Sequence, residues 1–418
     1  VARLICDVYK KDGTPYEGDP RYVLKKVLKE AADMGYEFHV GPECEFFLFH
    51  TDEEGRPTTN THENASYFDV GPIDLAENVR RDIVLNLEDM DIEVEASHHE
   101  LSPAQHEIDL QYTEGLEAAD HIMTFKMAAK TIAKRHGLHA TFMPKPKEGV
   151  NGSGMHINMS LSDKDGHNLF ADDSDELGLS QLAYRFMAGI LGHMKEMTIL
   201  TNPLVNSYKR LVPGYDAPIY IAWSPTSNRS SLIRIPSPRG EGTRIELRCP
   251  DSAMNPYLAL AACLQAGLDG IEKEMELPPC IQGNLFGMEP ETLKNKHVER
   301  IPETLGDAIE AYRDNFKKLY DTGVTVLAGS DMVLYKAPPL PIHQELGYMV
   351  DYGITPMEAI RTATYNAASV LGIENETGSL KEGLAGDLLI VKGDVSKNIR
   401  ALDDVQEVYL AGEIVYTV

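Results

Sequence analysis

Residues 41–49 read Gly-Pro-Glu-Cys-Glu-Phe-Phe-Leu-Phe, and carboxylates alternate with apolar side chains in the middle of this stretch. Glu43 and Glu45 stand on either side of Cys44, and Phe46 follows. Successive side chains of a strand point to opposite faces, so this spacing separates the carboxylates from the apolar groups. The stretch therefore predicts a strand with one face in a hydrophobic core and two carboxylates in a cavity.

Two further stretches, 154–161 and 243–249, show the same alternation. Their apolar members are Met155, Ile157, Met159, Ile245, Leu247 and Cys249. Their polar members are His156, Asn158, Ser160, Arg244, Glu246 and Arg248. Carboxylates, an imidazole and guanidinium groups are the side chains that bind cations and phosphate. We therefore expect the polar faces of all three strands to meet in one cavity.

The composition bounds the class of protein. The chain has 418 residues, 43% hydrophobic and 25% charged, which is typical of a soluble globular protein of roughly two or three domains. Its formal net charge of −26 argues against a nucleic-acid partner, which needs a basic surface. A small anion is still compatible, because a local group of arginines can outweigh the overall charge. That group is Arg210, Arg229, Arg234, Arg244 and Arg248.

The cysteines and the apolar runs indicate the compartment. The five cysteines are odd in number and contain no Cys-x-x-Cys pair, so we expect reduced thiols in a cytoplasmic protein. No apolar run reaches the ~18 residues of a membrane helix, so no membrane partner is expected. Residues 1–7 are expected to form a strand and not a signal peptide. Its uncovered edge would need a partner, so we expect a homo-oligomer.

Helix and strand signals alternate along the first three quarters of the chain. Helices are expected over 22–34 (after an Asp19-Pro20 start), 75–90 (capped by Asp74), 113–136, 180–200 and 256–277. Strands are expected over 37–49, 92–97, 106–111, 139–143, 154–161, 219–222, 231–235 and 243–249. This mixture predicts an α+β fold in which helices back a curved antiparallel sheet.

The pattern changes near Asn315. The expected elements beyond it are a helix from 316, a buried strand at 324–327, a helix from Thr355 to Gly372 and short strands over 387–418. Thr355 and Glu358 have the spacing of a capping box. We therefore predict a catalytic domain over 1–312 and a separate α/β appendage over 315–418.

Six candidate ligands suit a hard divalent cation. They are Glu43, Glu45, Glu100, Glu107, His156 and Glu246. Such an oxygen-rich set suits Mg²⁺ or Mn²⁺ better than a structural zinc, which prefers thiolates. The carboxylates would repel one another strongly without cations. A cation site beside an arginine cluster indicates phosphoryl transfer.

Each of these features also has an ordinary structural interpretation. A lone Glu-x-Glu is usually a solvated strand edge, and residues 151–154, Asn-Gly-Ser-Gly, alone are typical of a turn. His98, His99 and His106 are more often surface or supporting residues than ligands. The joint occurrence of these groups on alternating strands favours the functional interpretation.

Seven motifs occur in a fixed order along the chain. They are Gly-Pro-Glu-Cys-Glu-Phe-Phe-Leu-Phe (41–49), Glu-Ala-Ser-His-His-Glu (95–100), Gln-His-Glu-Ile-Asp (105–109), Asn-Gly-Ser-Gly-Met-His (151–156), Asn-Ser-Tyr-Lys-Arg-Leu-Val-Pro-Gly-Tyr (206–215), Asn-Arg-Ser (228–230) and Arg-Ile-Glu-Leu-Arg (244–248). With these motifs, residues 1–312 resemble the catalytic domain of a bacterial or archaeal type I glutamine synthetase.

The resemblance implies a role for each matching position. One cation site would consist of Glu45, Glu100 and Glu107, and a second, which bridges the phosphates, of Glu43, His156 and Glu246. ATP would be a co-substrate bound by Glu95, Asn158, Ser160 and Arg244. Glutamate would be bound by Asn151, Gly152, Arg210 and Arg248. The catalytic residues would be Asp216, Arg229 and Arg234.

The implied reaction makes glutamine in two steps. The γ-carboxylate of glutamate attacks the γ-phosphate of ATP, and ammonia, freed from ammonium by an acidic residue, displaces phosphate from the acyl phosphate. An acyl phosphate must be kept from water, so a closing loop is expected around 212–217. The acidic residue of this loop is usually Glu in the family, whereas Asp216 is one methylene shorter.

The family also has an N-terminal β-grasp domain of about 100 residues, whose loop completes the site of a neighbouring subunit. By the resemblance, this chain starts just after that domain and lacks the family's C-terminal locking helices. One alternative is therefore an inactive or weakly active fragment or fusion that binds Mg-nucleotide only.

Three features of residues 315–418 resemble the C-terminal end of a metal-dependent amidohydrolase. They are Gly329-Ser330-Asp331 after a strand, Ile354–Ala359, and Gly378–Ile390. By this resemblance, Asp331 would be a metal-binding carboxylate after the last barrel strand. The family's other metal ligands have no match upstream, and one strand cannot close an eight-stranded barrel. A hydrolase is therefore the weaker alternative.

Overall fold

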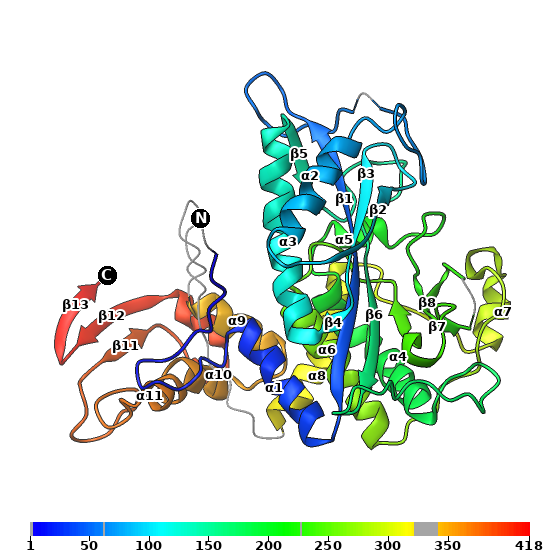
Figure 1. The fold of residues 1–418 in the computed structure, drawn as a ribbon. Helices are drawn as coiled ribbons and strands as arrows, with labels where there is room; N and C mark the ends of the chain where they lie inside the picture. Colours follow the sequence, from blue (N-terminus) through cyan, green and yellow to red (C-terminus); the bar gives the residue numbers. More distant parts are fainter. Residues whose placement is uncertain (1–2, 62, 226–227, 322–341) are drawn as a thin grey trace. The chain divides into compact units, whose positions relative to one another are not determined.

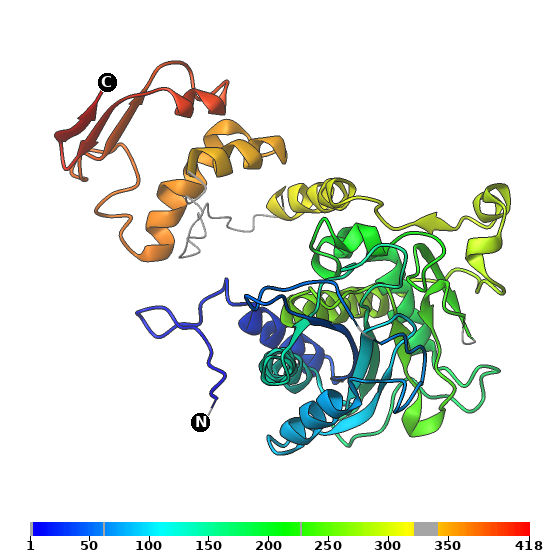
Figure 2. The same ribbon diagram turned by 90° about the horizontal axis from the view of Figure 1, so that it is seen from above.

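The computed structural model describes residues 3–61, 63–225, 228–321 and 342–418 (Figures 1 and 2). The chain forms two compact units, Val1–Ile309 and Glu310–Val418, and each is described by itself. The predicted strand at 324–327 and Asp331 lie outside the described residues. No helix among the described residues is long and apolar enough to span a membrane.

Ten strands form one sheet in the described part of the first unit, with the path β10-β7-β8-β9-β6-β1-β3-β2 and with β4 and β5 also paired to β1. The strands are β1 (Glu37–His50), β2 (Val94–His99), β3 (Gln105–Leu110), β4 (Thr113–Glu114), β5 (Leu138–Thr141), β6 (Met155–Ser162), β7 (Tyr220–Ser224), β8 (Ser231–Arg234), β9 (Ile245–Leu247) and β10 (Glu299–Arg300). The predicted α+β fold with a sheet backed by helices is confirmed. The sheet is not wholly antiparallel, because β7 and β8 pair in parallel.

Strand β1 is the centre of this sheet. Its 14 residues pair antiparallel with β3 along one edge and with β6 and then β5 along the other. In this register Glu43 lies opposite His156, and Glu45 lies opposite Glu107. The pairing therefore collects side chains that are far apart in the sequence on one face of the sheet.

Helices cover the other face. The helices of this unit are α1 (Pro20–Asp33), α2 (Glu77–Glu88), α3 (Gly115–Arg135), α4 (Gln181–Thr201), α5 (Ser207–Arg210), α6 (Pro256–Glu272) and α7 (Pro290–Asn295), and α8 (Leu305–Asp321) crosses into the second unit. Asp19 caps α1 as predicted, by accepting from the backbone N–H of Arg21.

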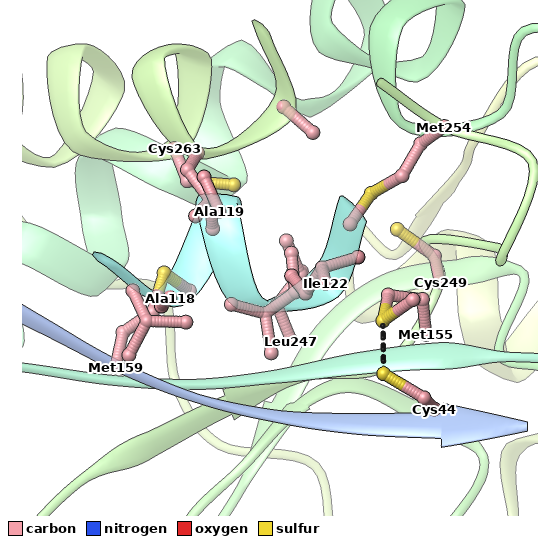
Figure 3. Packing of buried hydrophobic residues seen from close by; sticks show 14 of the residues in the cluster. Cys44, Ala118, Ala119, Ile122, Met155, Met159, Leu247, Cys249, Met254 and Cys263 are labelled. Atoms are coloured by element: carbon pink, nitrogen blue, oxygen red, sulfur yellow. Dashed lines mark hydrogen bonds between the residues drawn. The ribbon is translucent and has the colours of Figure 1, made fainter. Parts of the chain in front are cut away.

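The main hydrophobic core lies between the sheet and α1, α2, α3, α4 and α6. Figure 3 shows Ile122 of α3 and Cys263 of α6 above the strands that carry Cys44, Met155 and Leu247. Cys44 Sγ lies 3.4 Å from Met155 Sδ across β1 and β6. The apolar members of the three alternating stretches thus face this core, which leaves their polar members on the opposite face.

The second unit holds α9 (Ile342–Asp351), α10 (Pro356–Ala363), α11 (Tyr365–Leu371) and a three-stranded antiparallel sheet. The strands are β11 (Leu388–Val391), β12 (Val405–Leu410) and β13 (Glu413–Thr417). The predicted capping box is present, since Thr355 and Glu358 each bond the other's backbone. The single helix predicted up to Gly372 is wrong, because the backbone of Thr364 (φ −123°, ψ −96°) separates α10 from α11.

Two other local predictions differ from the structure. The helix predicted from 75 starts at Glu77, because Asp74 accepts a bond from the N–H of Ala76 in a turn before it. Residues 3–7 form no strand, so the predicted sheet edge at the start of the chain is absent from the described residues.

Candidate active site

Three strands bring a carboxylate, an imidazole and a second carboxylate together. One ligand atom each from Glu43, His156 and Glu246 lies within 4.8 Å of the others. His156 Nδ1 is 2.9 Å from Glu43 Oε2. These are the three residues predicted for the phosphate-bridging cation. Their convergence follows from the pairing of β1 with β6 and of β6 with β9.

Glu246 is fully buried and its charge is balanced by two arginines. Its side chain is 0% exposed, and it accepts hydrogen bonds from Arg234 and Arg248. Arg234 lies opposite Glu246 in the pairing of β8 with β9, and Arg248 follows two residues later on the same chain segment. The predicted phosphoryl-stabilising Arg234 and glutamate-binding Arg248 therefore both contact a predicted cation ligand.

A second group of acids lies beside the first. One ligand atom each from His98, Glu100 and Glu107 lies within 4.8 Å of the others. Glu45 lies opposite Glu107 and accepts bonds from Gln105 Nε2 (3.0 Å) and from the N–H of Gly154 (2.7 Å). The structure thus places Glu45 on β1, Glu107 on β3 and Glu100 directly after β2, and it adds His98 of β2.

The electrostatics of these acids indicate what they require. Burial and the charge of Glu45 raise the pKa of Glu100 to about 7. Burial and the charges of Asp109 and Glu45 raise the pKa of Glu107 well above its usual value. Divalent cations with oxygen ligands would remove this repulsion, so the donor set fits Mg²⁺ or Mn²⁺. Glu45, Glu100 and Glu107 would hold one ion and Glu43, His156 and Glu246 another.

A cavity of about 610 Å³ opens beside both groups. The predicted substrate and catalytic residues that line it are Asn151, Gly152, Arg210, Asp216, Arg229, Arg234 and Arg248. Asn151 Nδ2 donates to Asp216 Oδ2 over 3.3 Å, and Arg229 lies 3.5 Å from the same oxygen. The guanidinium of Arg210 is held by the carbonyls of Cys249 and Arg248. The cavity therefore presents several arginine side chains to an anionic substrate.

A second cavity, of about 830 Å³, holds all four predicted nucleotide-binding residues, Glu95, Asn158, Ser160 and Arg244. Arg244 Nε donates to Asn158 Oδ1 (3.1 Å), and Ser160 Oγ lies 2.5 Å from the hydroxyl of Tyr112. Glu43 lines both cavities. A ligand in the second cavity can therefore reach the cation groups at Glu43.

The sequence did not indicate several residues of the site. Tyr67 lines the first cavity from a loop, and its ring lies 5.4 Å from the guanidinium carbon of Arg229. No periodic signal marks a loop residue of this kind. Asp109 could have been found, because it follows Glu107 at the same spacing that separates Glu43 from Glu45. Its Oδ1 is buried without a hydrogen-bond partner.

The histidines beside the site are not at the surface. His99 and His106 are both buried and group with Asp74. Arg80 donates to Asp74 and lies 3.0 Å from His106 Nδ1. A guanidinium in this position opposes a cation, so we interpret the group as a support behind β3.

The chain is similar to known proteins over most of its length. The sequence profile of the family "Glutamine synthetase, catalytic domain" matches residues 17–327, and that of the "Amidohydrolase family" matches residues 271–415. A glutamine synthetase of Clostridium saccharobutylicum is 58% identical over 315 residues, which cover 75% of this chain and 71% of the relative. One of Staphylococcus aureus (strain MW2) is 57% identical over 316 residues, which cover 75% and 70%.

A solved structure, "GmaS/ADP complex-Conformation 1", superposes with a TM-score of 0.66 and 33% sequence identity, covering 76% of this chain and 78% of the other. The predicted resemblance, a glutamine synthetase catalytic domain followed by an amidohydrolase-like segment, is confirmed by the two profile matches.

Proposed function

The chain belongs to the glutamine synthetase family of glutamate–ammonia ligases, and we therefore propose that it makes glutamine from glutamate, ammonia and ATP through a γ-glutamyl phosphate. Enzymes of this family use ATP and Mg²⁺ or Mn²⁺. The position of Glu43, which lines both cavities, carries the proposal. It supports a nucleotide in one cavity whose terminal phosphate meets glutamate in the other.

The first step needs charge neutralisation and alignment. Cations bound at the two acidic groups would neutralise the phosphate oxygens. We call the first cavity, which Arg229 and Arg234 line, the glutamate cavity, and the second cavity the nucleotide cavity. The guanidinium groups of Arg229 and Arg234 can donate planar hydrogen bonds to the transferring phosphoryl group. Asn151, Gly152, Arg210 and Arg248 would hold the glutamate so that a γ-carboxylate oxygen attacks phosphorus and ADP leaves.

The second step needs a proton acceptor. Asp216 lines the same cavity and is held by Asn151 and Arg229. We assign it the proton of ammonium, so that ammonia can attack the acyl carbon and phosphate can leave.

The proposal extends to the chain as a whole. We assign the activity to the predicted domain 1–312 and none to 315–418, and among the described residues no potential metal cluster lies in 342–418. We also propose that the protein is a homo-oligomer in the cytoplasm. Its other partners would be small-molecule substrates. The described cysteines are all free, as in a reducing compartment.

The experiment that tests the proposal traps the intermediate. Hydroxylamine in place of ammonia should convert an acyl phosphate to γ-glutamyl hydroxamate when MgATP and glutamate are both present. Glu43→Gln should abolish the product, and Glu53→Gln, at an exposed residue that lines neither cavity, should not. Hydroxamate formed without ATP would contradict the proposal, and MgATP binding without any product would favour the non-catalytic alternative.

A further inference from the structure

A buried lysine without any role assigned above joins two loops of the glutamate cavity. The side chain of Lys145 belongs to a residue that is only 9% exposed. Its Nζ donates to the carbonyl of Val150 and lies 3.4 Å from the centroid of the Tyr215 ring. In the described chain, no carboxylate lies within ion-pair distance of this ammonium. Its partners are therefore a carbonyl oxygen and the face of an aromatic ring.

Each of these contacts stands next to a residue of the site. Val150 precedes Asn151, and Tyr215 precedes Asp216. Asn151 Nδ2 and Asp216 Oδ2 meet over 3.3 Å. Lys145 thus contacts the residue before each partner of this hydrogen bond, Val150 in the loop of Asn151 and Tyr215 in loop 212–217.

In the described chain, the backbone of Lys145 is held by more hydrogen bonds from outside its own segment than the backbone of loop 212–217, which its side chain touches. The backbone of Lys145 is clamped by Asn206, whose side chain accepts from the N–H (2.7 Å) and donates to the carbonyl (3.0 Å). Loop 212–217 is shaped by local turns, in which Val212 bonds to the carbonyl of Arg210 and Ala217 to that of Tyr215. The lysine is therefore a fixed point, and the loop is the part that it can hold.

We propose that Lys145 is a positioning residue that holds loop 212–217 over the glutamate cavity through the ring of Tyr215. The role rests on the ligase activity proposed above. Lys145 is absent from the residues that line the cavity, whereas Tyr215, Asp216 and Ala217 are among them. Its action on the reaction therefore passes through the loop, which keeps water from the acyl phosphate until ammonia arrives.

The first test measures how well the two steps stay coupled. Release of the loop should let water attack γ-glutamyl phosphate, giving glutamate and phosphate in place of glutamine. Lys145→Met should raise glutamate-dependent phosphate release without ammonium by about 2- to 30-fold, the range that a cation–π contact supports. Tyr215→Leu should do the same, and the double variant should add little to either. Lys145→Arg and Tyr215→Phe keep a cation and a ring and should stay close to the parent.

Lys147→Met is the matched control, two residues away on the same segment, and should leave the coupling unchanged. Additive effects of the two single variants, or full coupling in both, would overturn the proposal. The proposal is supported if phosphate release matches glutamine formation in the parent and exceeds it in Lys145→Met and Tyr215→Leu.

The second test needs no turnover. Amide hydrogen exchange over 211–218 should be faster in Lys145→Met than in the parent and in Lys145→Arg, while exchange in β1 stays the same. Equal exchange over 211–218 in all three would overturn the proposal. A parent chain without ligase activity would contradict the proposed function alone, because the exchange data would still decide whether Lys145 holds the loop.

Discussion

Glu43 on β1 lies directly opposite His156 on β6, with Glu43 Oε2 2.9 Å from His156 Nδ1. The same register places Cys44 beside Met155 in the core. A slip by one residue would turn the carboxylates of β1 into the core and its apolar groups into the cavity. Core packing and the acid cluster are thus fixed by one strand pairing.

Loss of Glu246 should remove the nucleotide's cation. Glu246→Ala should weaken MgATP binding by at least about 10-fold, because even groups that only support a metal ligand typically contribute that much. It should also lower stability, since Arg234 and Arg248 lose a buried partner. Calorimetric titration with MgATP measures the first effect, and thermal unfolding the second.

Glu246→Gln keeps the size of the side chain and separates the two effects. Glu88→Ala, on the exposed side of α2, is the control and should change neither. Tight MgATP binding by both Glu246 variants would refute its assignment as a ligand.

Loss of Arg229 should act on the chemistry and not on nucleotide binding. Arg229 lines the glutamate cavity but not the nucleotide cavity. Arg229→Ala should therefore spare the Kd for MgATP and lower kcat by about 10²- to 10³-fold, as for the loss of one preorganised donor to a transition state. Stopped assays of phosphate release give kcat. An equal loss of binding and of kcat would indicate a disrupted site instead.

Without divalent cations, stability should fall as the pH rises. Burial and the charge of Glu43 raise the pKa of Asp109 to about 8, and burial and Glu45 raise that of Glu100 to about 7. A carboxyl whose folded pKa is raised stabilises the fold below its unfolded pKa and loses that contribution as the pH rises through the folded value. The loss should therefore extend from about pH 4 to about pH 8 and reach a few kcal/mol in total.

Urea unfolding in EDTA at pH 5.5 and at pH 8.5 measures this loss. Saturating Mg²⁺ should reduce the difference between the two pH values, and Glu107→Gln should reduce it in EDTA. The same pH dependence with and without Mg²⁺ would show that these acids do not hold the cation.

The contact between α4 and α6 should not tolerate a methyl group at Gly189. A Cβ there would lie 2.0 Å from the carbonyl oxygen of Ala266 and 2.9 Å from the backbone of Gly270. Overpacking in Gly189→Ala should lower the free energy of unfolding by about 1–3 kcal/mol. This is a net loss, because it remains after the ~1 kcal/mol by which a helix favours alanine over glycine.

Gly192→Ala is the matched control in the same helix, because its Cβ would meet only the flexible end of Met275. Urea unfolding should find it close to the parent in stability. Equal effects of the two substitutions would contradict the packing of α4 on α6.

The alternation along the strands was sufficient to predict much of the site. Period two places Glu43 and Glu45 on the same face of their strand, and it puts His156 and Glu246 on the faces opposite their apolar neighbours. The partners of these residues depend on register, which the sequence does not state. For this reason the sequence indicated no partner for His98, which lies one residue beyond the strand predicted at 92–97. Asp109 lies on the strand predicted at 106–111, and its spacing from Glu107 alone places both on one face.

Loops and breaks were beyond the sequence for a different reason. Tyr67 and Lys145 act from segments without periodicity, so nothing in the pattern marks where their side chains point. Neither the parallel pairing of β7 with β8 nor the break at Thr364 has a periodic signal in the sequence.

The most direct test of the central claim measures phosphate release from MgATP by the full chain, with and without glutamate and ammonium, beside Glu246→Ala. We predict release that needs glutamate, becomes fast only with ammonium, matches the glutamine formed and is absent from the variant. Phosphate release that does not depend on glutamate, or that persists in Glu246→Ala, would contradict the assignment of this cavity as a glutamine-forming site.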